Sequence, residues 1–555
     1  MADISSRTSA PGGPKPSTAL ADFASSVVVF LVAIPLCLGI AVASGVPVAM
    51  GLVSGIVGGI VVGLLAGSPL QVSGPAAGLA VIVFGFVDRY GLAALGPVLV
   101  AAGALQILAG FLRIGSWFRA ISPAVVHGML AGIGILIVLG QIHVLMGSKP
   151  AAGGIDNVAA MDESVAALFN HAEPVANAAS QAAAAVPASP TAGDTDALPV
   201  WMADIFTTEA LALMIGVASL LAMIGWEKLR PARLRLVPGA LVGVGFGTLL
   251  AVVFNLPIAR VQLPASLLDG ISVPAAADFL RLTEPGIFVT VLVIAVIASA
   301  ETLLSAAAVD RMHDGVRTRF NRELFAQGVG NGICGMLGAL PITGVIVRSS
   351  ANVQAGAKTR ASAVMHGVWV LALVALLPQL LGVVPLTALA AVLLVTGCRL
   401  VSLHHVRHLF DHHGWVPVGI WLATVAMIVT QDLLIGVGIG LALSIMEIAP
   451  HLRRRLRIES REENGAIALT LDGAATCKDL PALLDTLESL PSNRNVQLVG
   501  RDLHFVDHTS AETISDWVKR EARAGRKMEF IHPRHGDRHK RLGPLFHRLD
   551  AEARA

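Results

Sequence analysis

Long apolar segments recur along the chain from Ala21 to Pro450, and most of them are long enough to cross a lipid bilayer as a helix. A spanning helix needs roughly 17–25 predominantly apolar residues. Of the 555 residues, 54% are hydrophobic and only 14% are charged, whereas soluble domains carry about 25% charged residues. Backbone polar groups in hydrocarbon must be satisfied within the segment itself, which favours helices. The sequence therefore predicts a polytopic α-helical membrane protein.

Fourteen helical spans fit the hydropathy pattern. Lys and Arg mark cytoplasmic loops, and basic residues follow the fourth, sixth, eighth and twelfth spans and the last one, which ends in "HLRRRLRIESREE". These even-numbered spans therefore lead into basic loops, so both termini are expected in the cytoplasm. The predicted spans are 21–44, 48–66, 75–88, 92–112, 124–146, 205–226, 236–256, 286–308, 320–339, 345–358, 361–380, 383–397, 415–430 and 432–450.

Three regions outside these spans have their own composition. Residues 1–20 lack the order of a cleaved signal and are expected to form a disordered cytoplasmic tail. Residues 151–200 contain six acidic residues and no Lys or Arg, which predicts a poorly ordered extracytoplasmic loop insert in the transmembrane domain, 21–450. The strand-like runs "AIALTLDG", "NVQLVGRDLHFVD" and "RKMEFIH" surround an amphipathic helix. This order predicts a small cytoplasmic α/β domain over 457–555.

Two short hydrophobic segments begin at Gly and Pro: "QVSGPAAGLAVIVFGFV", the third span, and "PITGVIVRSSANVQAG", the tenth. Each is the third span of its group of seven, a placement that indicates a binding site at the membrane midplane of an inverted-repeat transporter. A helix that starts inside the membrane leaves free N–H groups and a positive dipole end, and two such ends can hold an anion. Small residues would let the anion approach the backbone: Gly74, Ala76, Ala77, Gly78 and Gly344.

Two charged residues lie at membrane depth. Arg348 comes one turn into the tenth span, where an arginine costs at least ~2.5–3.5 kcal/mol, so we expect it to add a full positive charge to the anion site. The alternative is a simple kink with an arginine that reaches the interface. Glu301 and Ser305 share one face of the eighth span. The carboxylate could carry a proton, bind a coupling cation, or form a static ion pair with Arg348.

The remaining polar clusters favour simpler interpretations. The histidines from His404 to His413 (404, 405, 408, 412 and 413) indicate a basic headgroup loop, with metal binding as the less favoured alternative. The four cysteines have no metal-type spacing and are expected to be isolated thiols. No nucleophile–base pair or phosphate loop occurs in the sequence. We therefore expect no enzyme activity, cofactor, metal site or nucleic-acid partner.

Several long motifs resemble the SulP (sulfate permease) anion transporters, bacterial relatives of solute carrier family twenty-six. They include "IPLCLGIAVASGVPVAMGLVSGIVGG", "QVSGPAAGLAVIV", "ETLLSAAAVDRM" and "NRELFAQGVGNGICGMLGALPITGVIVRSSANVQAGAKTR". The C-terminal "LHFVDHTSAETISDW" resembles the central strand and helix of the STAS domain that follows the membrane part in this family. The resemblance covers nearly the whole chain outside 151–200.

The resemblance implies fourteen spans in a seven-plus-seven inverted repeat, divided into core and gate domains that move as an elevator. It also implies a homodimer in the bacterial inner membrane. Glu301 and Ser305 fall where some members place a sodium- or proton-coupling group. The residues that the resemblance places in the anion site are Ala76, Ala77, Val345, Ile346, Val347 and Arg348.

The chain departs from sodium-coupled bicarbonate members at two positions, since Glu301 replaces an aspartate and Ile346 a hydroxyl residue. Only the hydroxyl of Ser305 is kept, which favours a proton over sodium. Val347 replaces a serine of some relatives and leaves anion coordination to the backbone. Thr509 falls near a hydroxyl that is phosphorylated in regulatory homologues, although we expect no such switch here.

The predicted function is proton-coupled secondary transport of bicarbonate or sulfate. A C4-dicarboxylate carrier is the first alternative, and a nucleobase carrier of the same architecture is less favoured. The alternative from another class is a membrane-anchored STAS regulator that has lost transport.

Overall fold

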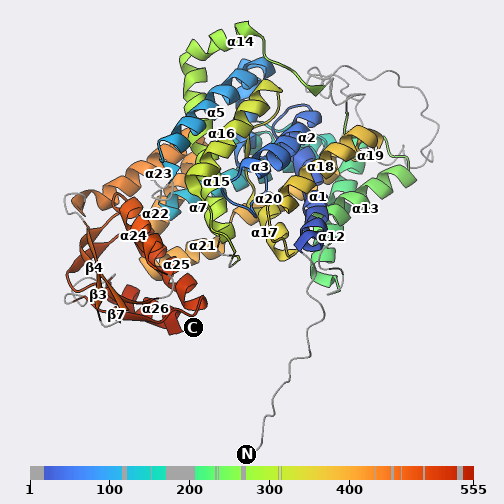
Figure 1. The fold of residues 1–555 in the computed structure, drawn as a ribbon. Helices are drawn as coiled ribbons and strands as arrows, with labels where there is room; N and C mark the ends of the chain where they lie inside the picture. The colour runs from blue at the N-terminus through green and yellow to red at the C-terminus, as the bar shows by residue number, and fades with distance from the viewer. Residues whose placement is uncertain are drawn as a thin grey trace, which may run out of the picture.

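The computed structural model describes residues 18–115, 122–151, 153–169, 207–231, 234, 237–263, 270–310, 312–313, 315–431, 433–451, 456–463, 466–491, 494–533 and 542–554. A large helical domain is followed by a small α/β domain at one end of the molecule (Figure 1).

All fourteen predicted spans correspond to helices. Seven are long and apolar enough to cross a membrane, and four shorter ones are also apolar, within the described residues. The first seven are α1 (Thr18–Ala43), α2 continuing through a π-helical turn into α3 (Val48–Leu65), α4 (Ala80–Tyr90), α5 (Leu95–Phe111), α7 (Pro123–Leu145), α12 (Thr208–Leu229) and α13 (Gly239–Val253). The second seven are α15 (Pro285–Asp310), α16 (Phe320–Met336), α17 (Ile346–Gln354), α18 (Ala361–Leu376), α20 (Leu386–Leu400), α22 (Trp415–Thr430) and α23 (Leu433–Ile448). The prediction of a polytopic helical fold is confirmed.

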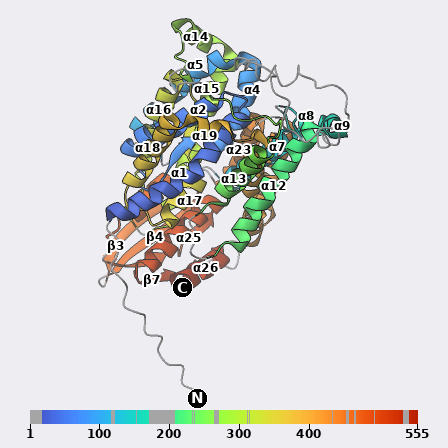
Figure 2. The same cartoon turned by 90° about the vertical axis from the view of Figure 1, so that its right-hand side faces the viewer.

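The helices pack in two groups. Spans one to four of each half lie together: α5 packs on α16, α1 on α18, and α15 on α5 and α17. Spans five to seven of each half form the other group, in which α7 packs on α20 and α22, and α12 on α13 and α20. Figure 2 shows α12 and α13 on the opposite side of the molecule from α16 and α18. The same positions of each half thus supply the same group, as an inverted repeat requires.

Several local predictions were wrong. The third span does not begin as a helix at Pro75, because Ser73–Pro75 forms a short strand. The first helix begins at Thr18, inside the predicted tail, and residues 1–17 lie outside the described residues. The basic loop that contains the histidines is instead a helix, α21 (Leu403–His413), and the ring of His405 stacks on that of His127 with centroids 4.2 Å apart.

The insert was predicted to be poorly ordered, but its first part forms α8 (Gly154–Ala159) and α9 (Met161–Phe169). Asn157 explains this order, since its side chain bonds the backbone of Ala151 in both directions, at 3.0 and 2.8 Å. His143 of α7 also bonds Ser164 at 2.7 Å and the carbonyl of Asn157 at 2.8 Å. These helices are therefore fastened to α7, and residues 170–206 lie outside the described part of the chain.

Glycines bring α5 and α16 into backbone contact. A β-carbon on Gly103 would lie 2.6 Å from the carbonyl oxygen of Gly328 and from the amide nitrogen of Gly332. A β-carbon on Gly335 would lie 2.6 Å from the carbonyl oxygen of Gly96. Small residues allow close helix packing in membranes, where no hydrophobic force brings helices together. The glycines of these two helices thus fix their separation.

The C-terminal domain contains a five-stranded sheet covered by helices. The strand β4 (Ala466–Ala475) pairs antiparallel with β3 (Arg457–Glu463) and parallel with β5 (Asn495–Val499) and β6 (Leu503–Val506), and β7 (Met528–Ile531) extends the sheet beside β5. The helices are α24 (Leu480–Ser489), α25 (His508–Arg523) and α26 (Leu542–Arg554). The predicted α/β character is confirmed. The structure also contains β3, α24 and α26, which the sequence analysis did not predict.

Replacing Gly103 with alanine should destabilise the helical domain by about 1–3 kcal/mol, the usual cost of overpacking. The new methyl group would press on backbone atoms of α16, which have no rotamer to change. Gly332→Ala is the matched control, because a β-carbon there meets nothing within 4 Å. Thermal unfolding in detergent should show a lower midpoint for Gly103→Ala alone, and equal midpoints would contradict this account of the packing.

Candidate anion-binding site

Two short strands cross at the centre of the helical domain. β1 (Ser73–Pro75) pairs antiparallel with β2 (Ile342–Gly344), with Gly74 opposite Thr343. The ladder continues at both ends, since the N–H of Val345 donates to the carbonyl of Val72 at 2.9 Å and that of Ala76 to Pro341 at 3.1 Å. β1 leads into the 3₁₀ turn Ala77–Leu79 and α4, and β2 leads into α17. Both half-helices therefore begin at this crossing.

The start of α17 has free backbone donors. Among the described residues, none accepts a hydrogen bond from the N–H groups of Ile346, Val347 or Arg348. The cap residue Val345 offers no side-chain acceptor. Ile346 is 39% exposed, and Val345 and Val347 are half-buried. The helix thus presents unpaired N–H groups and its positive dipole end at an accessible edge, an arrangement suited to an anion.

On the other side of the ladder lie the small residues of the first half-helix. Ala76 is buried and Ala77 half-buried. A β-carbon on Gly74 would collide with the guanidinium of Arg348, so a larger residue there would require the guanidinium to move. A β-carbon on Gly344 would likewise require the side chain of Gln71 to move. The structure therefore brings the predicted residues of both half-helices together around one short ladder.

Arg348 is fully buried, with no exposed surface. Its Nη2 lies 3.5 Å from the carbonyl oxygen of Ala33 and 3.3 Å from Sγ of Cys37, both on α1. Its Nε and Nη1 have no hydrogen-bond partner in the described part of the chain. The arginine does not reach an interface, so the simple-kink alternative is wrong. Its charge is held inside the domain behind the ladder, with two donors unused.

Glu301 and Arg348 do not form an ion pair in the described structure, so the hypothesis of a static bridge is wrong. The carboxyl group of Glu301 lies instead against Gly78, where a β-carbon would sit 2.9 Å from Oε2, and near the Thr343 side chain. Its Oε2 is shielded and has no hydrogen-bond partner among the described residues. Ser305 is buried one turn further along α15. The acidic group therefore adjoins the first half-helix, with its Oε2 unpaired in the described part of the chain.

Side chains that the sequence reasoning missed hold the ladder in place. Asn331 bonds both backbone groups of Ile342, accepting from its N–H at 2.8 Å and donating to its carbonyl at 3.1 Å. It also donates to Gln106 of α5 at 2.8 Å. From α15, the Thr302 hydroxyl accepts from the N–H of Gly344 at 3.1 Å, and its carbonyl accepts from Gln71 at 3.0 Å. Non-helical backbone at membrane depth needs such partners.

A signal for part of this scaffold was present in the sequence. Glu323, Gln327 and Asn331 recur every four residues on α16, which places three polar groups on one face of an apolar helix. Glu323 accepts from the N–H groups of Gly67 and Ser68 at 2.8 and 2.9 Å, before β1. Gln327 donates to Ser73 at 2.5 Å. This face of α16 therefore provides hydrogen-bond partners for polar groups from Gly67 to the ladder.

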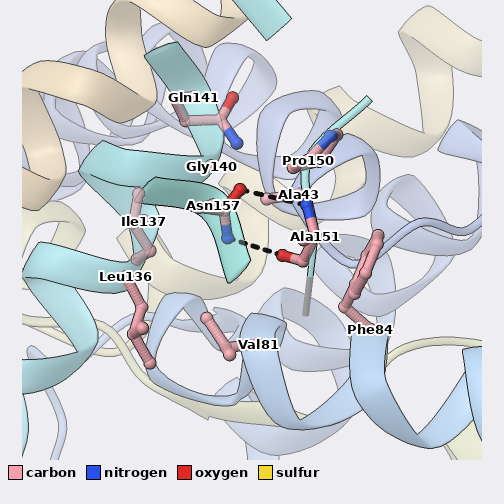
Figure 3. Close-up of a pocket in the computed structure, with 10 residues that line it drawn as sticks. All are labelled: Ala43, Val81, Phe84, Leu136, Ile137, Gly140, Gln141, Pro150, Ala151 and Asn157. Carbon is pink, nitrogen blue, oxygen red and sulfur yellow. Dashed lines mark hydrogen bonds between the residues drawn. The ribbon is translucent and has the colours of Figure 1, made fainter. Parts of the chain in front are cut away.

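A small recess of about 30 Å³ lies between the two helix groups (Figure 3). Val81 and Phe84 of α4, one and two turns beyond Ala77, line it together with Gln141 of α7. Gln141 is buried, and its Oε1 has no partner in the described residues. The recess thus joins the first half-helix to the second helix group. No cluster of three potential metal ligands occurs within the described ranges.

Comparison with known proteins agrees with this architecture. The model of the Sulfate permease family matches residues 20–189 and 194–424. The chain belongs to this family. The match covers both half-helices, Glu301 and Arg348, so the site described above lies within the matched residues.

Members of the sulfate permease family and their structures show how far the likeness extends. The Bacillus subtilis protein named "Putative sulfate transporter YvdB" is 27% identical over 89% of this chain and 87% of its own length. The transmembrane domain of a cyanobacterial bicarbonate transporter, BicA, has a TM-score of 0.61 and 20% identity, covering 76% of this chain and 97% of that structure. SLC26A9 has a TM-score of 0.60 and 13% identity, covering 96% of this chain and 87% of that structure. The two structures support the fold.

Thr302→Val should weaken the site, since it leaves the N–H of Gly344 without an acceptor while preserving the shape of the side chain. An unsatisfied buried donor costs about 1–3 kcal/mol. Thermal unfolding in detergent should show this loss, and anion uptake should fall with it. Thr302→Ser keeps the hydroxyl and is the control. Equal stability of the valine and serine variants would contradict the role given to this hydrogen bond.

Proposed function

We propose that the protein is a secondary transporter of small inorganic anions, bicarbonate or sulfate, which it moves together with a proton. The anion is held between the starts of α4 and α17, in contact with the backbone around Ala77 and Ile346. Arg348 supplies the fixed positive charge, and Glu301 carries the proton.

The unpaired donors of α17 carry this proposal. Three consecutive N–H groups without acceptors, at an accessible helix start, are costly to leave unsatisfied and suited to an anion. The buried guanidinium behind them has two further nitrogens without a hydrogen-bond partner and no carboxylate partner among the described residues. Apolar side chains at Val345, Ile346 and Val347 leave coordination to the backbone, which suits a small anion that sheds most of its water.

Proton coupling rests on the surroundings of Glu301. Its free Oε2 faces no cation among the described residues, and desolvation favours the protonated form of a carboxyl group. A proton is therefore the simplest species to neutralise it in an apolar helix. Because Glu301 lies against Gly78 at the start of the first half-helix, its protonation changes the electrostatic potential at the anion site.

The names of the relatives support the substrate class, since they include sulfate and bicarbonate transporters. The two helix groups support an elevator movement, in which the group that carries the ladder shifts against the group of α7, α12, α13, α20, α22 and α23. We further infer a homodimer in the bacterial inner membrane, with both termini in the cytoplasm.

Uptake into proteoliposomes tests the proposal. An anion panel of bicarbonate, sulfate and C4-dicarboxylates should be measured with pH and sodium gradients imposed separately. Uptake of an inorganic anion driven by a pH gradient is expected. Preference for a dicarboxylate would favour the alternative of a C4-dicarboxylate carrier. No uptake of any anion would favour a membrane-anchored regulator without transport.

Arg348→Ala should abolish high-affinity anion binding while the protein remains folded. Loss of a buried charged partner costs about 2–5 kcal/mol, which corresponds to a loss of affinity of about thirtyfold or more. Isothermal titration in detergent measures the affinity, and Arg348→Lys, which keeps a positive charge, should retain part of it. Wild-type affinity in the alanine variant would remove Arg348 from the site.

Glu301→Gln should uncouple anion flux from the pH gradient, because the amide has nearly the shape of the protonated acid but cannot release a proton. Flux down an anion gradient should continue and become independent of an imposed pH difference. Ser305→Ala, on the same helix face, serves as the control and should retain the pH response. A pH response in Glu301→Gln equal to that of the wild type would exclude the proton role.

A further inference from the structure

Gln141 lies near the end of α7 and is 2% exposed. Among the described residues, neither the Oε1 nor the Nε2 of its carboxamide has a hydrogen-bond partner. Turning the amide over would not change this, because both atoms are unpaired. The carboxamides of Gln106 and Asn331, in contrast, are bonded through both of their polar atoms. A buried polar group without a partner costs stability and calls for an explanation.

The recess of Figure 3 lies between the two helix groups at this point. Val81 and Phe84 of α4 and Ala43, the last residue of α1, line it from the group that carries the ladder, and Gln141 lines it from the other group. On the topology inferred above, α1 and α7 both run outward, so their ends lie in the outer half of the membrane. The recess therefore lies between the anion site and the outer face.

Residues that follow α7 form a third side of this recess. Ala151 and Asn157 line it, and the carboxamide of Asn157 is fully used (Figure 3). It donates to the carbonyls of Ala151 and Gly153 at 2.8 and 2.7 Å and accepts from the N–H of Ala151 at 3.0 Å. His143, two residues beyond Gln141, fastens this segment to α7. Of the two carboxamides that line the recess, only that of Gln141 is unused.

The size and lining of the recess indicate when Gln141 could meet a partner. A space of about 30 Å³ holds roughly one water molecule, and such a water needs about two to four polar partners. Apart from Gln141 and Asn157, the side chains around it are apolar. Resident water is therefore poorly held, and an anion can enter only when α4 and α7 separate. The N–H groups of a carboxamide can then donate to an anion that has lost water.

We propose that Gln141 is a substrate-contact residue, which hydrogen-bonds the anion as it passes between α4 and α7 on the outer side of the ladder. This role rests on the proposed function and adds to it a contact from the helix group opposite the ladder. When the two groups are closed at this point, as in the described structure, the carboxamide is left unpaired. When they move apart, it replaces part of the water that the anion has shed.

Gln141→Leu separates this role from a structural one, because leucine has nearly the same size and no polar atoms. The thermal midpoint of the full chain in detergent should rise by about 2 °C, since an unpaired buried group is removed. The concentration of bicarbonate or sulfate at half-maximal uptake into proteoliposomes should rise about tenfold, since a hydrogen bond to a charged partner is lost. A side chain with only a packing role would not make the protein more stable and its transport weaker.

Gln106→Leu is the matched control for stability. Gln106 is 1% exposed, but its carboxamide bonds Ser299 at 3.2 Å and Asn331 at 2.8 Å, so the same substitution should lower the midpoint. Gln141→Met provides a second apolar variant if the leucine variant does not fold. A lower midpoint, or half-maximal uptake at the wild-type concentration, in the apolar Gln141 variant would overturn this role. If the wild type takes up no inorganic anion, the proposed function fails, and this role fails with it.

Discussion

The structure depends on how the polar backbone of one short crossing is satisfied inside an apolar domain. Chain that is neither helix nor closed barrel is tolerated at membrane depth only when it is buried in protein or lines a cavity. Here β1 and β2 form hydrogen bonds with each other, and the side chains of Asn331, Gln327 and Thr302 bond further polar groups of the two strands. The N–H groups at the start of α17 remain without acceptors within the described residues. Because most polar groups around them are hydrogen-bonded, these free N–H groups indicate a binding site.

The same constraint explains how much of the site the sequence could reveal. Gly and Pro at matching positions of the two halves predicted the half-helices, and an intramembrane arginine and glutamate were recognisable as costly residues. The pairing of Ser73–Pro75 with Ile342–Gly344 was not predictable, because three-residue strands leave no periodic pattern. The absence of an ion pair between Glu301 and Arg348 depends on side-chain geometry, so sequence spacing could not decide it.

Helix number and grouping were easier to predict than the regions between helices. Apolar runs separated by basic loops carry a strong signal, and all fourteen spans correspond to helices. The insert was misjudged because its Ala- and Gly-rich composition resembles that of disordered chain, whereas Asn157 and His143 order its first part through particular hydrogen bonds. His508 contacts Ser122, 386 positions away in the chain, and also Glu447, and only the fold brings these residues together.

The burial of Arg348 has a consequence for selectivity. A guanidinium without exposed surface acts on an anion through its electric field, which falls with distance and is indifferent to the shape of the ion. The apolar side chains of Val345, Ile346 and Val347 can exclude a bulky solute but offer no directional bond, so the directional contacts come only from backbone N–H groups, which any small oxyanion can accept from. A site of this kind ranks anions by charge and by the free energy needed to strip their hydration shells. The chemistry of water around the ion would thus decide which substrate is carried.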